Sequence, residues 1–282
     1  MTHLDVTAAR SLLFHELYDG YPMLPAKRRA KILEVLRREK MASIKDLSDV
    51  LGISVSTVRR DVEYLAESGH LSRTHGGAMV QDTHFTTFEP EPEIATAMEG
   101  AAKTAIGRRA AELILPGQTV IFDSGTTTMA AAKAARARGI GFTAFTNDLG
   151  IATVLSGNPA IQTHISAGYV RPGTGTLLGA AAVQSVGRLR ADLAFIGTHA
   201  MTVDDVSDTS IELAEIKRAI ISATDKAILL VDSSKMDHRA FCAFGRTSEL
   251  ALIITDSRIA PVGRAAFEAR GLPLDIVDEA LG

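Results

Sequence analysis

The spacing of hydrophobic residues in the first part of the chain predicts three short helices, because apolar side chains recur there every three or four positions. The predicted helices cover about residues 26–39, residues 44–51 and a third segment that begins after Ser54. Four apolar residues of the third segment share this spacing: Val55, Val58, Val62 and Leu65. They should form one buried stripe, which leaves the opposite face of that helix exposed.

Polar residues at the helix ends predict a tight turn between the second and third helices. Ser43 is a suitable N-cap for the second helix, and Asp46 occupies the capping-box position three residues later. Gly52 can adopt the left-handed conformation that closes a helix. Because Ser54 can cap the next helix, the pair is predicted to form a helix-turn-helix.

The exposed face of the third helix carries donors that are suited to DNA. Its polar side chains are Ser54, Ser56, Thr57, Arg59 and Arg60. In a major groove, Arg reads guanine O6 and N7, whereas Ser and Thr contact base edges or phosphates. Residues 70–78 then predict a short strand and a Gly76–Gly77 turn, which form a wing from which Arg73 and His75 reach phosphates.

From Lys103 onward, short apolar runs alternate with helical segments. The runs expected as strands are 119–123, 141–146, 160–165, 191–197, 227–232 and 251–255, with helices near 127–138 and 148–156. Such alternation predicts a mostly parallel sheet covered on both faces, with ligands at the carboxyl ends of its strands. The predicted fold class is therefore α/β, preceded by an all-α, winged N-terminal part.

Charge and composition divide the chain into four parts: an extension at 1–23, a DNA-binding domain at 24–80, a linker at 81–100 and a ligand-sensing domain at 101–282. Residues 24–80 hold 11 Lys and Arg against 7 Asp and Glu in a chain of net charge -3, as expected where one domain meets a polyanion. Four of these cations lie on the outer face of the first helix as solvated charges or phosphate contacts: Lys27, Arg28, Arg29 and Lys31.

The linker and the extension have different compositions. Residues 81–100 contain EPEPE and no Lys or Arg, so prolines and like charges should keep this segment extended. Residues 6–18 have an apolar side and predict a short amphipathic helix. We expect that helix to pack against the chain's own domains or against a partner subunit.

The remaining composition argues against membrane and metal proteins. No apolar run approaches the ~20 residues that span a bilayer, and residues 1–10 lack the layout of an export signal, so a cytoplasmic protein is expected. Cys242 is the single cysteine, and the eight histidines are scattered. We therefore expect no disulfide, no metal site and no other cofactor.

The turn after the first predicted strand has the composition of a phosphate-binding loop. Residues 123–128 read DSGTTT, where Gly125 lets backbone N–H groups point inward and three threonines supply hydroxyls. The following helix offers the positive end of its dipole. A capped strand-helix turn would use the same residues, but other strand ends add the amide of Asn147 and the cation of Lys235.

Two N-terminal segments, STVRRDVEYL and LSRTHGGA, resemble the DNA-binding domain of the DeoR family of bacterial sugar-responsive transcriptional regulators. DSGTTT, FTND, ADLAFIG and LLVDSSK follow in that family's order, so that the resemblance covers roughly residues 26–256. It implies an effector domain similar to ribose-phosphate isomerase-like folds.

The same resemblance implies roles for eight residues in binding a sugar phosphate. The phosphate would be held by Ser124, Gly125, Thr126 and Thr127, with charge added by Lys235. The residues implied to face the sugar or to stabilise its surroundings are Asp123, Asn147 and Lys217. Ala167-Gly168 and the segment MTVDDVSD depart from the family's glycine patterns, so the family's better-known ligands are not assigned here.

These observations favour a DNA-binding repressor of a sugar-catabolism operon that is relieved by a phosphorylated sugar. The alternative is a sugar-phosphate isomerase-like enzyme with an accessory nucleic-acid-binding module, which needs a base at the substrate carbon. Four carboxylates could serve, and nothing singles one out: Asp123, Glu212, Glu215 and Asp232. An RNA-binding regulator is disfavoured because the recognition face has no row of exposed aromatics.

A single DNA-reading domain contacts few bases, so selective binding of operator DNA requires more than one copy. We therefore expect a homo-oligomer, either a dimer or a tetramer, on repeated half-sites.

Overall fold

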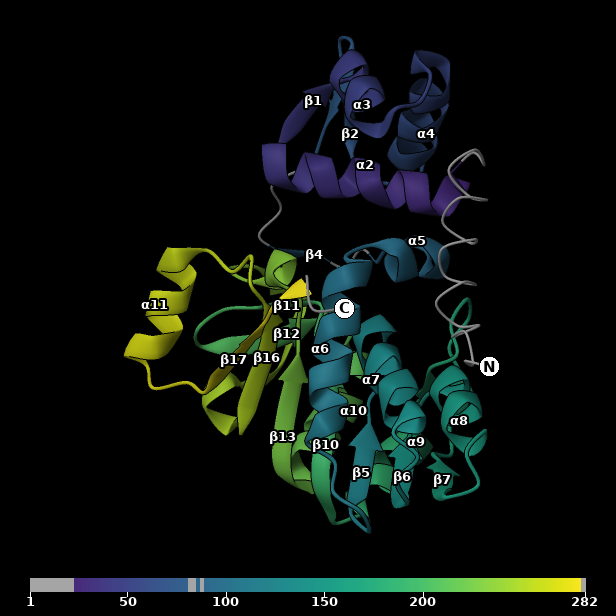
Figure 1. Cartoon of the computed structure of the whole chain (residues 1–282), viewed down its shortest axis with the longest axis vertical. Helices are drawn as coiled ribbons and strands as arrows, with labels where there is room; N and C mark the ends of the chain where they lie inside the picture. The colour runs from purple at the N-terminus through teal and green to yellow at the C-terminus, as the bar shows by residue number, and fades with distance from the viewer. Residues whose placement is uncertain (1–22, 81–84, 87–88, 280–282) are drawn as a thin grey trace, which may run out of the picture.

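The computed structural model describes residues 23–80, 85–86 and 89–279. A small N-terminal head stands on a larger α/β domain (Figure 1). The elements of the head are α2 (Pro25–Glu39), β1 (Met41–Ser43), α3 (Ile44–Leu51), α4 (Val55–Glu67), β2 (Ser72–Thr74) and β3 (Gly77–Met79). The helix predicted over residues 6–18 lies outside the described residues.

Local capping builds the helix-turn-helix as the sequence predicts. Ser43 Oγ accepts a hydrogen bond from Asp46 N at 3.0 Å, and Asp46 Oδ2 accepts one from Ser43 N at 3.3 Å, which completes the capping box. Gly52 ends α3 in the left-handed region with a φ of 65°. Ser54 Oγ accepts from Thr57 N at 3.2 Å, so α4 begins directly after this cap.

The predicted apolar stripe of α4 forms the centre of the head, with one exception. Val58, Val62 and Leu65 are buried against residues of α2 and α3. Val55 is 40% exposed, because the buried stripe begins one helical turn later, at Val58. The structure also adds a strand that the pattern did not predict, since β1 pairs antiparallel with β3 and makes the wing three-stranded.

Two of the cations predicted on the outer face of α2 instead point into the head. Arg28 donates to both carboxylate oxygens of Asp61, which is 2% exposed, and Arg29 Nε lies 3.2 Å from Asp61 Oδ1. The Arg29 guanidinium also lies 3.4 Å from the centroid of the Tyr64 ring. The expectation for Arg28 and Arg29 was therefore wrong, because a buried carboxylate on α4 requires cationic partners.

The α/β domain is built on a sheet of seven parallel strands in the order β17-β16-β13-β10-β5-β6-β7. Six of them match the predicted runs, and β17 was not predicted. The strands are β5 (Thr119–Phe122), β6 (Phe142–Thr146), β7 (Ile161–Ile165), β10 (Ala191–Gly197), β13 (Thr224–Leu230), β16 (Leu252–Asp256) and β17 (Leu274–Val277).

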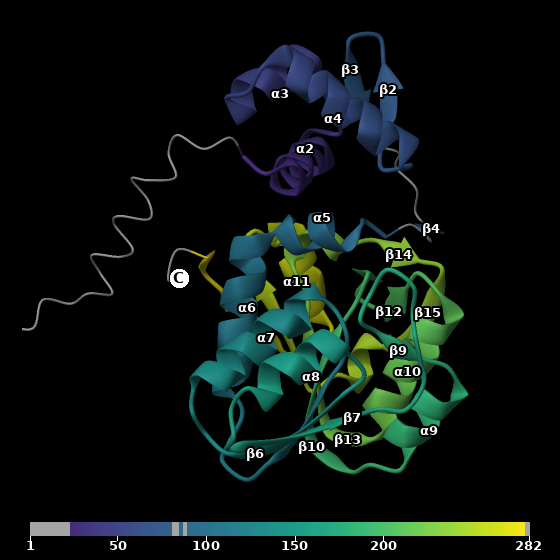
Figure 2. The same ribbon diagram turned by 90° about the vertical axis from the view of Figure 1, so that its right-hand side faces the viewer.

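Helices cover both faces of this sheet, as predicted for alternating strands and helices. One apolar cluster packs α6 (Gly100–Glu112), α7 (Thr126–Ala137) and α8 (Leu149–Ser156) against one face. A second cluster packs α9 (Ala180–Gly187), α10 (Ile211–Ser222) and α11 (Pro261–Ala269) against the other. The two clusters form the core of the domain, and Figure 2 shows α6, α7 and α8 on the side of the sheet opposite to α9 and α10.

Shorter elements connect the strands and helices of the domain. A hairpin joins β8 (Tyr169–Val170) to β9 (Leu177–Leu178), and an antiparallel sheet joins β11 (Ala200–Met201), β12 (Asp205–Asp208) and β15 (Cys242–Arg246). β14 (Arg239–Ala240) pairs with β4 (Phe85–Thr86), and short 3-10 helices lie at η1 (Ser233–Lys235) and η2 (Thr247–Glu249).

The acidic segment before α6 is not an extended spacer. Pro92 begins a short helix, α5 (Pro92–Ala97), at a position where proline is tolerated. Ile94 and Met98 from this segment are buried in the apolar core of the head. The prediction of an extended linker was wrong here, because apolar side chains at helical spacing gain more from burial than like charges gain from separation.

We expect Asp61→Asn to lower the free energy of unfolding of the head by about 1–3 kcal/mol, because it removes the charged acceptor of two guanidinium groups. The loss should be visible as faster hydrogen exchange of α4 amides under native conditions. Glu63→Gln is the matched control, since the Glu63–Arg73 pair is 55% and 61% exposed and should contribute less than about 1 kcal/mol. Equal effects of the two substitutions would contradict this assignment.

Candidate nucleic-acid interface and effector site

The residues predicted to read DNA lie together at the start of α4. Arg59 and Arg60 are exposed, and neither guanidinium has an ion-pair partner in the described part of the chain. Ser54 Oγ lies 3.0 Å from Ser56 Oγ and 2.8 Å from Thr57 Oγ1. In both ribbon views, α2 lies between the α3–α4 pair and the α/β domain (Figures 1 and 2).

The wing presents the two other residues predicted to contact DNA. His75 is exposed in the turn between β2 and β3. Arg73 Nη1 pairs with Glu63 Oε1 at 3.2 Å, and both side chains are more than half exposed. Such an exposed pair contributes little to stability, so Arg73 can exchange Glu63 for a phosphate.

The register of the parallel strands brings the predicted ligand-binding residues to one edge of the sheet. Phe122 of β5 pairs with Thr146 of β6 and with Phe195 of β10, and Leu230 of β13 pairs with Gly197 of β10. The polar residues that follow these strands are Asp123, Ser124, Asn147, Thr198 and Asp232. This common edge, formed by the residues after β5, β6, β10 and β13, is the candidate effector site.

A buried ammonium group holds this edge together. Lys217 of α10 donates to Asp123 Oδ2 and, at 2.9 Å, to Gly197 O, and its Nζ lies 3.5 Å from Asp208 Oδ2. Burial opposes the charge of Lys217, but attraction to Asp123 and Asp208 outweighs it and raises the pKa of Lys217. Of its two predicted roles, the geometry fits stabilisation of the surroundings, because these partners already use the ammonium donors.

The turn after β5 has the backbone geometry of an anion-binding loop. Gly125 has a φ of 129°, which favours glycine, and it is the N-cap of α7. The first N–H groups of a helix have no partners within it. Ser124 and Thr127 are buried beside this turn and Thr126 is half-buried, whereas Thr128 Oγ1 donates to Gly125 O at 2.8 Å and holds the turn.

Three buried residues at the same edge, Asn147, Asp123 and Asp232, carry polar atoms without hydrogen-bond partners. Asn147 is 1% exposed, and neither its Oδ1 nor its Nδ2 makes a hydrogen bond to protein. Asp123 Oδ1 is also unpartnered. Leaving such an atom unpaired costs about 1–3 kcal/mol, and native structures rarely keep one without a water or a ligand. These atoms have free hydrogen-bonding capacity that a ligand at this edge could use.

Lys235 adds a half-buried cation to this edge. Its Nζ donates to Thr198 O at 2.9 Å and lies 3.9 Å from Asp232 Oδ2. His199, which follows Thr198 in the chain, was not predicted as a site residue. Its position two residues after the predicted strand 191–197 could have indicated that it lies at this edge. Burial, together with the nearby positive charge of Lys235, lowers the pKa of His199 to about 4, so the imidazole is neutral near pH 7.

Lys103 of α6 is a second cation that sequence reasoning missed. Its Nζ donates to Ala95 O and Met98 O, both at 2.6 Å. Burial, with repulsion from Lys235, lowers the pKa of Lys103 to about 8. Arg37 of α2 contributes to the lowered pKa values of both Lys103 and His199, so this cation of the head lies within electrostatic range of the effector site.

A continuous chain of contacts joins the head to the loop that carries Lys235. Glu34 of α2 accepts a hydrogen bond from Glu99 N at 2.7 Å, and the Glu99 carboxylate lies 2.5 Å from Arg258 Nη2. Arg258 Nε in turn lies 3.0 Å from Asp256 Oδ1. Asp256 accepts from Ser233 N at 2.7 Å. We name this set, Glu34, Glu99, Arg258, Asp256 and Ser233, the inter-domain relay.

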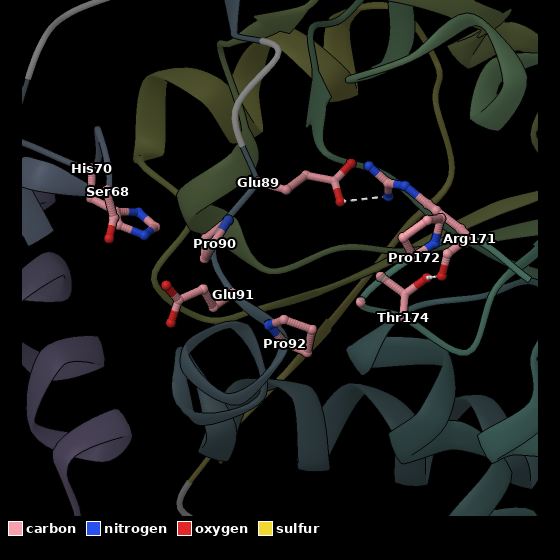
Figure 3. A pocket seen from close by; sticks show the side chains of 10 residues that line it. Ser68, His70, Glu89, Pro90, Glu91, Pro92, Arg171, Pro172 and Thr174 are labelled. Carbon is pink, nitrogen blue, oxygen red and sulfur yellow. Dashed lines mark hydrogen bonds and ion pairs between the residues drawn. The ribbon is translucent and has the colours of Figure 1, made fainter.

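A cleft of about 260 Å³ lies between the head, the acidic segment and the β8–β9 hairpin (Figure 3). Ser68 and His70 line it on the side of the head, and Arg171 and Thr174 line it on the side of the sensor domain. Glu89 lies between these sides and pairs with Arg171. The residues of the predicted phosphate loop do not line this cleft.

The pKa of His199 makes the stability of the protein depend on pH. Because this pKa, about 4, lies below the 6.5 of an exposed imidazole, the unfolded chain binds more protons between these values, and stability is lost as pH falls through that window. Between pH 7 and pH 5 the loss should be about 2 kcal/mol. His199→Gln should remove it, as measured by urea unfolding followed by circular dichroism at both pH values.

His75→Gln, in the exposed turn of the wing, serves as the control and should keep the pH dependence of the wild type. An unchanged difference between pH 7 and pH 5 in His199→Gln would show that other groups cause the loss.

None of the helices in the described ranges is long and apolar enough to cross a membrane. Within the same ranges, no group of three or more His, Cys, Asp or Glu side chains is placed to hold a metal ion.

Comparison with known proteins identifies both parts of the chain. Residues 28–84 match the DeoR-like helix-turn-helix domain, and residues 98–257 match the DeoR C terminal sensor domain. The HTH-type transcriptional regulator GolR of Listeria innocua is 31% identical over 91% of this chain and 100% of its own. The HTH-type transcriptional repressor GlcR of Bacillus subtilis is 30% identical over 83% of this chain and 89% of its own.

Ribose 5-phosphate isomerase A from Methanocaldococcus jannaschii aligns with a TM-score of 0.36 and 13% identity over 49% of this chain and 54% of that one. The relatives in sequence, however, are named as regulators and a repressor, so the isomerase-like alternative is not favoured. The chain belongs to the DeoR family and is a DNA-binding transcriptional regulator with a helix-turn-helix head and a sensor domain.

Proposed function

We propose that this regulator represses a sugar-catabolism operon in the cytoplasm and is released from its operator by a phosphorylated sugar. The observation that carries the proposal is the pair of buried residues with unpartnered polar atoms, Asn147 and Asp123, beside the first turn of α7. A ligand with hydroxyl groups at one end and a phosphate at the other would satisfy both features.

The phosphate is the end that the loop after β5 would hold. Backbone N–H groups at the start of α7 and the hydroxyls of Ser124, Thr126 and Thr127 would donate hydrogen bonds to the phosphate. No cation besides Lys235 is then needed. Lys235, which is 25% exposed, can turn from Thr198 O toward a phosphate. The sugar hydroxyls would then pair with Asn147 and with the free oxygen of Asp123.

The geometry gives little support to catalysis at this edge. Asp123 was a candidate base, but its Oδ2 is bound by Lys217 and by Gly197 N at 3.1 Å. The contact with Lys217 fixes the position of the carboxylate and opposes the rise in pKa that burial causes at Asp123. We therefore assign Asp123 to ligand binding and assign no residue to proton transfer.

Operator binding would use α4 as the recognition helix and the wing as a phosphate clamp. Because the recognition helix of one head contacts few base edges, through side chains such as Arg59 and Arg60, selectivity requires a homo-oligomer, a dimer or a tetramer, on repeated half-sites. Effector binding would shift the heads out of register by a coupling free energy of about 1–3 kcal/mol, which corresponds to a change in affinity of roughly 5- to 150-fold.

A thermal-shift panel of phosphorylated sugars tests the proposed ligand class, because a ligand that binds only the folded state raises the melting temperature. At least one sugar phosphate should raise it, while the corresponding free sugar should not. A panel without any such response would contradict the proposal.

Arg60→Ala should weaken specific operator binding by about 1–3 kcal/mol, because a bidentate contact with guanine is lost. Fluorescence anisotropy with an operator fragment measures this loss. Arg188→Ala, an exposed arginine after α9 in the sensor domain, is the matched control. If both variants bind the operator like the wild type, Arg60 does not read a base.

Thr126→Val should leave operator affinity unchanged and abolish release by the sugar phosphate, because the substitution keeps the shape of the side chain and removes its hydroxyl. Titration of the preformed protein–operator complex with the ligand measures release. Thr153→Val, an exposed threonine on α8, should respond like the wild type. Normal release of Thr126→Val would remove this residue from the site.

A further inference from the structure

Glu89 belongs to the acidic segment between the domains, yet its side chain reaches into the sensor domain. Its Oε2 lies 2.8 Å from Arg171 Nη1 (Figure 3). Its Oε1 accepts a hydrogen bond from the hydroxyl of Thr209. Both carboxylate oxygens of one residue before α5 are therefore held by donors of the sensor domain.

The two donors that hold Glu89 are each connected to the effector site. Arg171 follows β8, and its hairpin is tied to the end of β6 because Leu177 N donates to Asn147 O at 2.7 Å. Thr209 directly follows Asp208, the carboxylate that lies 3.5 Å from Lys217 Nζ. Glu89 thus joins two segments that lie on different sides of that site.

The Glu89 carboxylate also acts electrostatically on His199, which follows β10. Its negative charge partly offsets the burial that lowers the pKa of His199. Glu91 and Glu99, the other acidic residues beside α5, point elsewhere: Glu91 accepts from Tyr64 Oη at 2.6 Å, and Glu99 pairs with Arg258. Glu89 is therefore the carboxylate of these three that contacts the rim of the effector site.

The source of the carboxylate distinguishes Arg171 from the cations of the effector site. Lys217 and Lys235 pair with carboxylates of the sensor domain itself, namely Asp123, Asp208 and Asp232. The anion held by Arg171 comes instead from the segment between the domains. A guanidinium beside a hydroxyl is a donor set that binds any oxyanion of suitable size, whether a carboxylate or a phosphate.

We propose that Arg171 and Thr209 form an oxyanion subsite, occupied here by the carboxylate of Glu89, and that a second anionic group of the effector, besides the phosphate at the loop after β5, displaces Glu89 from it. The subsite stands on its own geometry, whereas its link to release from DNA rests on the proposed function. In this scheme Glu89 is an internal competitor that lowers the apparent affinity for the effector.

The surroundings of the pair permit such an exchange. Arg171 and Glu89 are both 29% exposed, and ion pairs that water reaches contribute little to stability, so an incoming anion can replace one partner. The adjacent cleft of about 260 Å³ is smaller than the roughly 300–1,000 Å³ of most small-molecule sites. It has room for an anionic end group rather than for a whole ligand.

Displacement of Glu89 would also change how the head is held. Two residues after Glu89, Glu91 binds Tyr64 of α4, and α5 then packs on the core of the head. Release of Glu89 from Arg171 therefore removes one attachment between the sensor domain and a segment that packs on the head. Coupling between two binding sites is reciprocal. Operator DNA that favours the arrangement in which Glu89 pairs with Arg171 would therefore weaken binding of the anion.

The test is isothermal titration of the full chain with inorganic phosphate at constant ionic strength, with chloride as the balancing anion. Glu89→Gln should bind phosphate about tenfold more tightly than the wild type, because the competing charge is gone. Glu93→Gln, an exposed carboxylate of the same segment, should bind like the wild type. Arg171→Ala in the Glu89→Gln background should remove the gain.

Equal phosphate affinity of the wild type and Glu89→Gln overturns the subsite, as does absence of phosphate binding in both proteins or a gain that survives Arg171→Ala. The proposed function is judged separately, by sugar phosphates that stabilise the wild type and release its operator. Tighter, Arg171-dependent phosphate binding without any sugar-phosphate response would retain the subsite and reject the proposed function. Circular dichroism of each variant verifies that it is folded.

Discussion

The buried ammonium of Lys217 is the interaction on which the effector site depends. It joins α10 to Asp123 after β5, to Gly197 at the end of β10 and to Asp208 at the end of β12. A buried carboxylate without a cation would be strongly destabilising, and Lys217 opposes the rise in pKa that burial causes at Asp123. The loop from Ser124 to Thr127 and the amide of Asn147 are arranged around the position that this contact fixes.

Much of the fold followed from local patterns, because caps and apolar periodicity act over a few residues. Ser43, Gly52 and Ser54 delimit the helix-turn-helix as predicted, and six apolar runs became parallel strands. The misses depend on contacts between distant segments. Asp61 draws Arg28 inward across 33 positions, and the helix α5 forms because the head supplies a core for Ile94. The local sequence around Arg28 does not indicate its pairing with Asp61, and the local sequence around Ile94 does not indicate its packing on the head.

The candidate site shows the same division between local and distant information. The residues at strand ends could be named from sequence, because every parallel strand delivers its carboxyl end to one edge. Lys217 was named through resemblance alone, and its position 94 residues after Asp123 explains why spacing gave no indication. His199, Lys103 and Arg171 were missed because their roles arise from burial and from neighbours that only the folded chain provides. The inter-domain relay from Glu34 to Ser233 belongs to this second class.

We infer that binding of an effector at the carboxyl edge of the sheet changes the affinity of the head for operator DNA. The most direct measurement is the operator affinity of the full chain with and without a sugar phosphate that calorimetry has shown to be bound at saturation. We predict a change of roughly 5- to 150-fold, the usual range for coupled sites. Equal operator affinity of the liganded and unliganded protein would contradict the account.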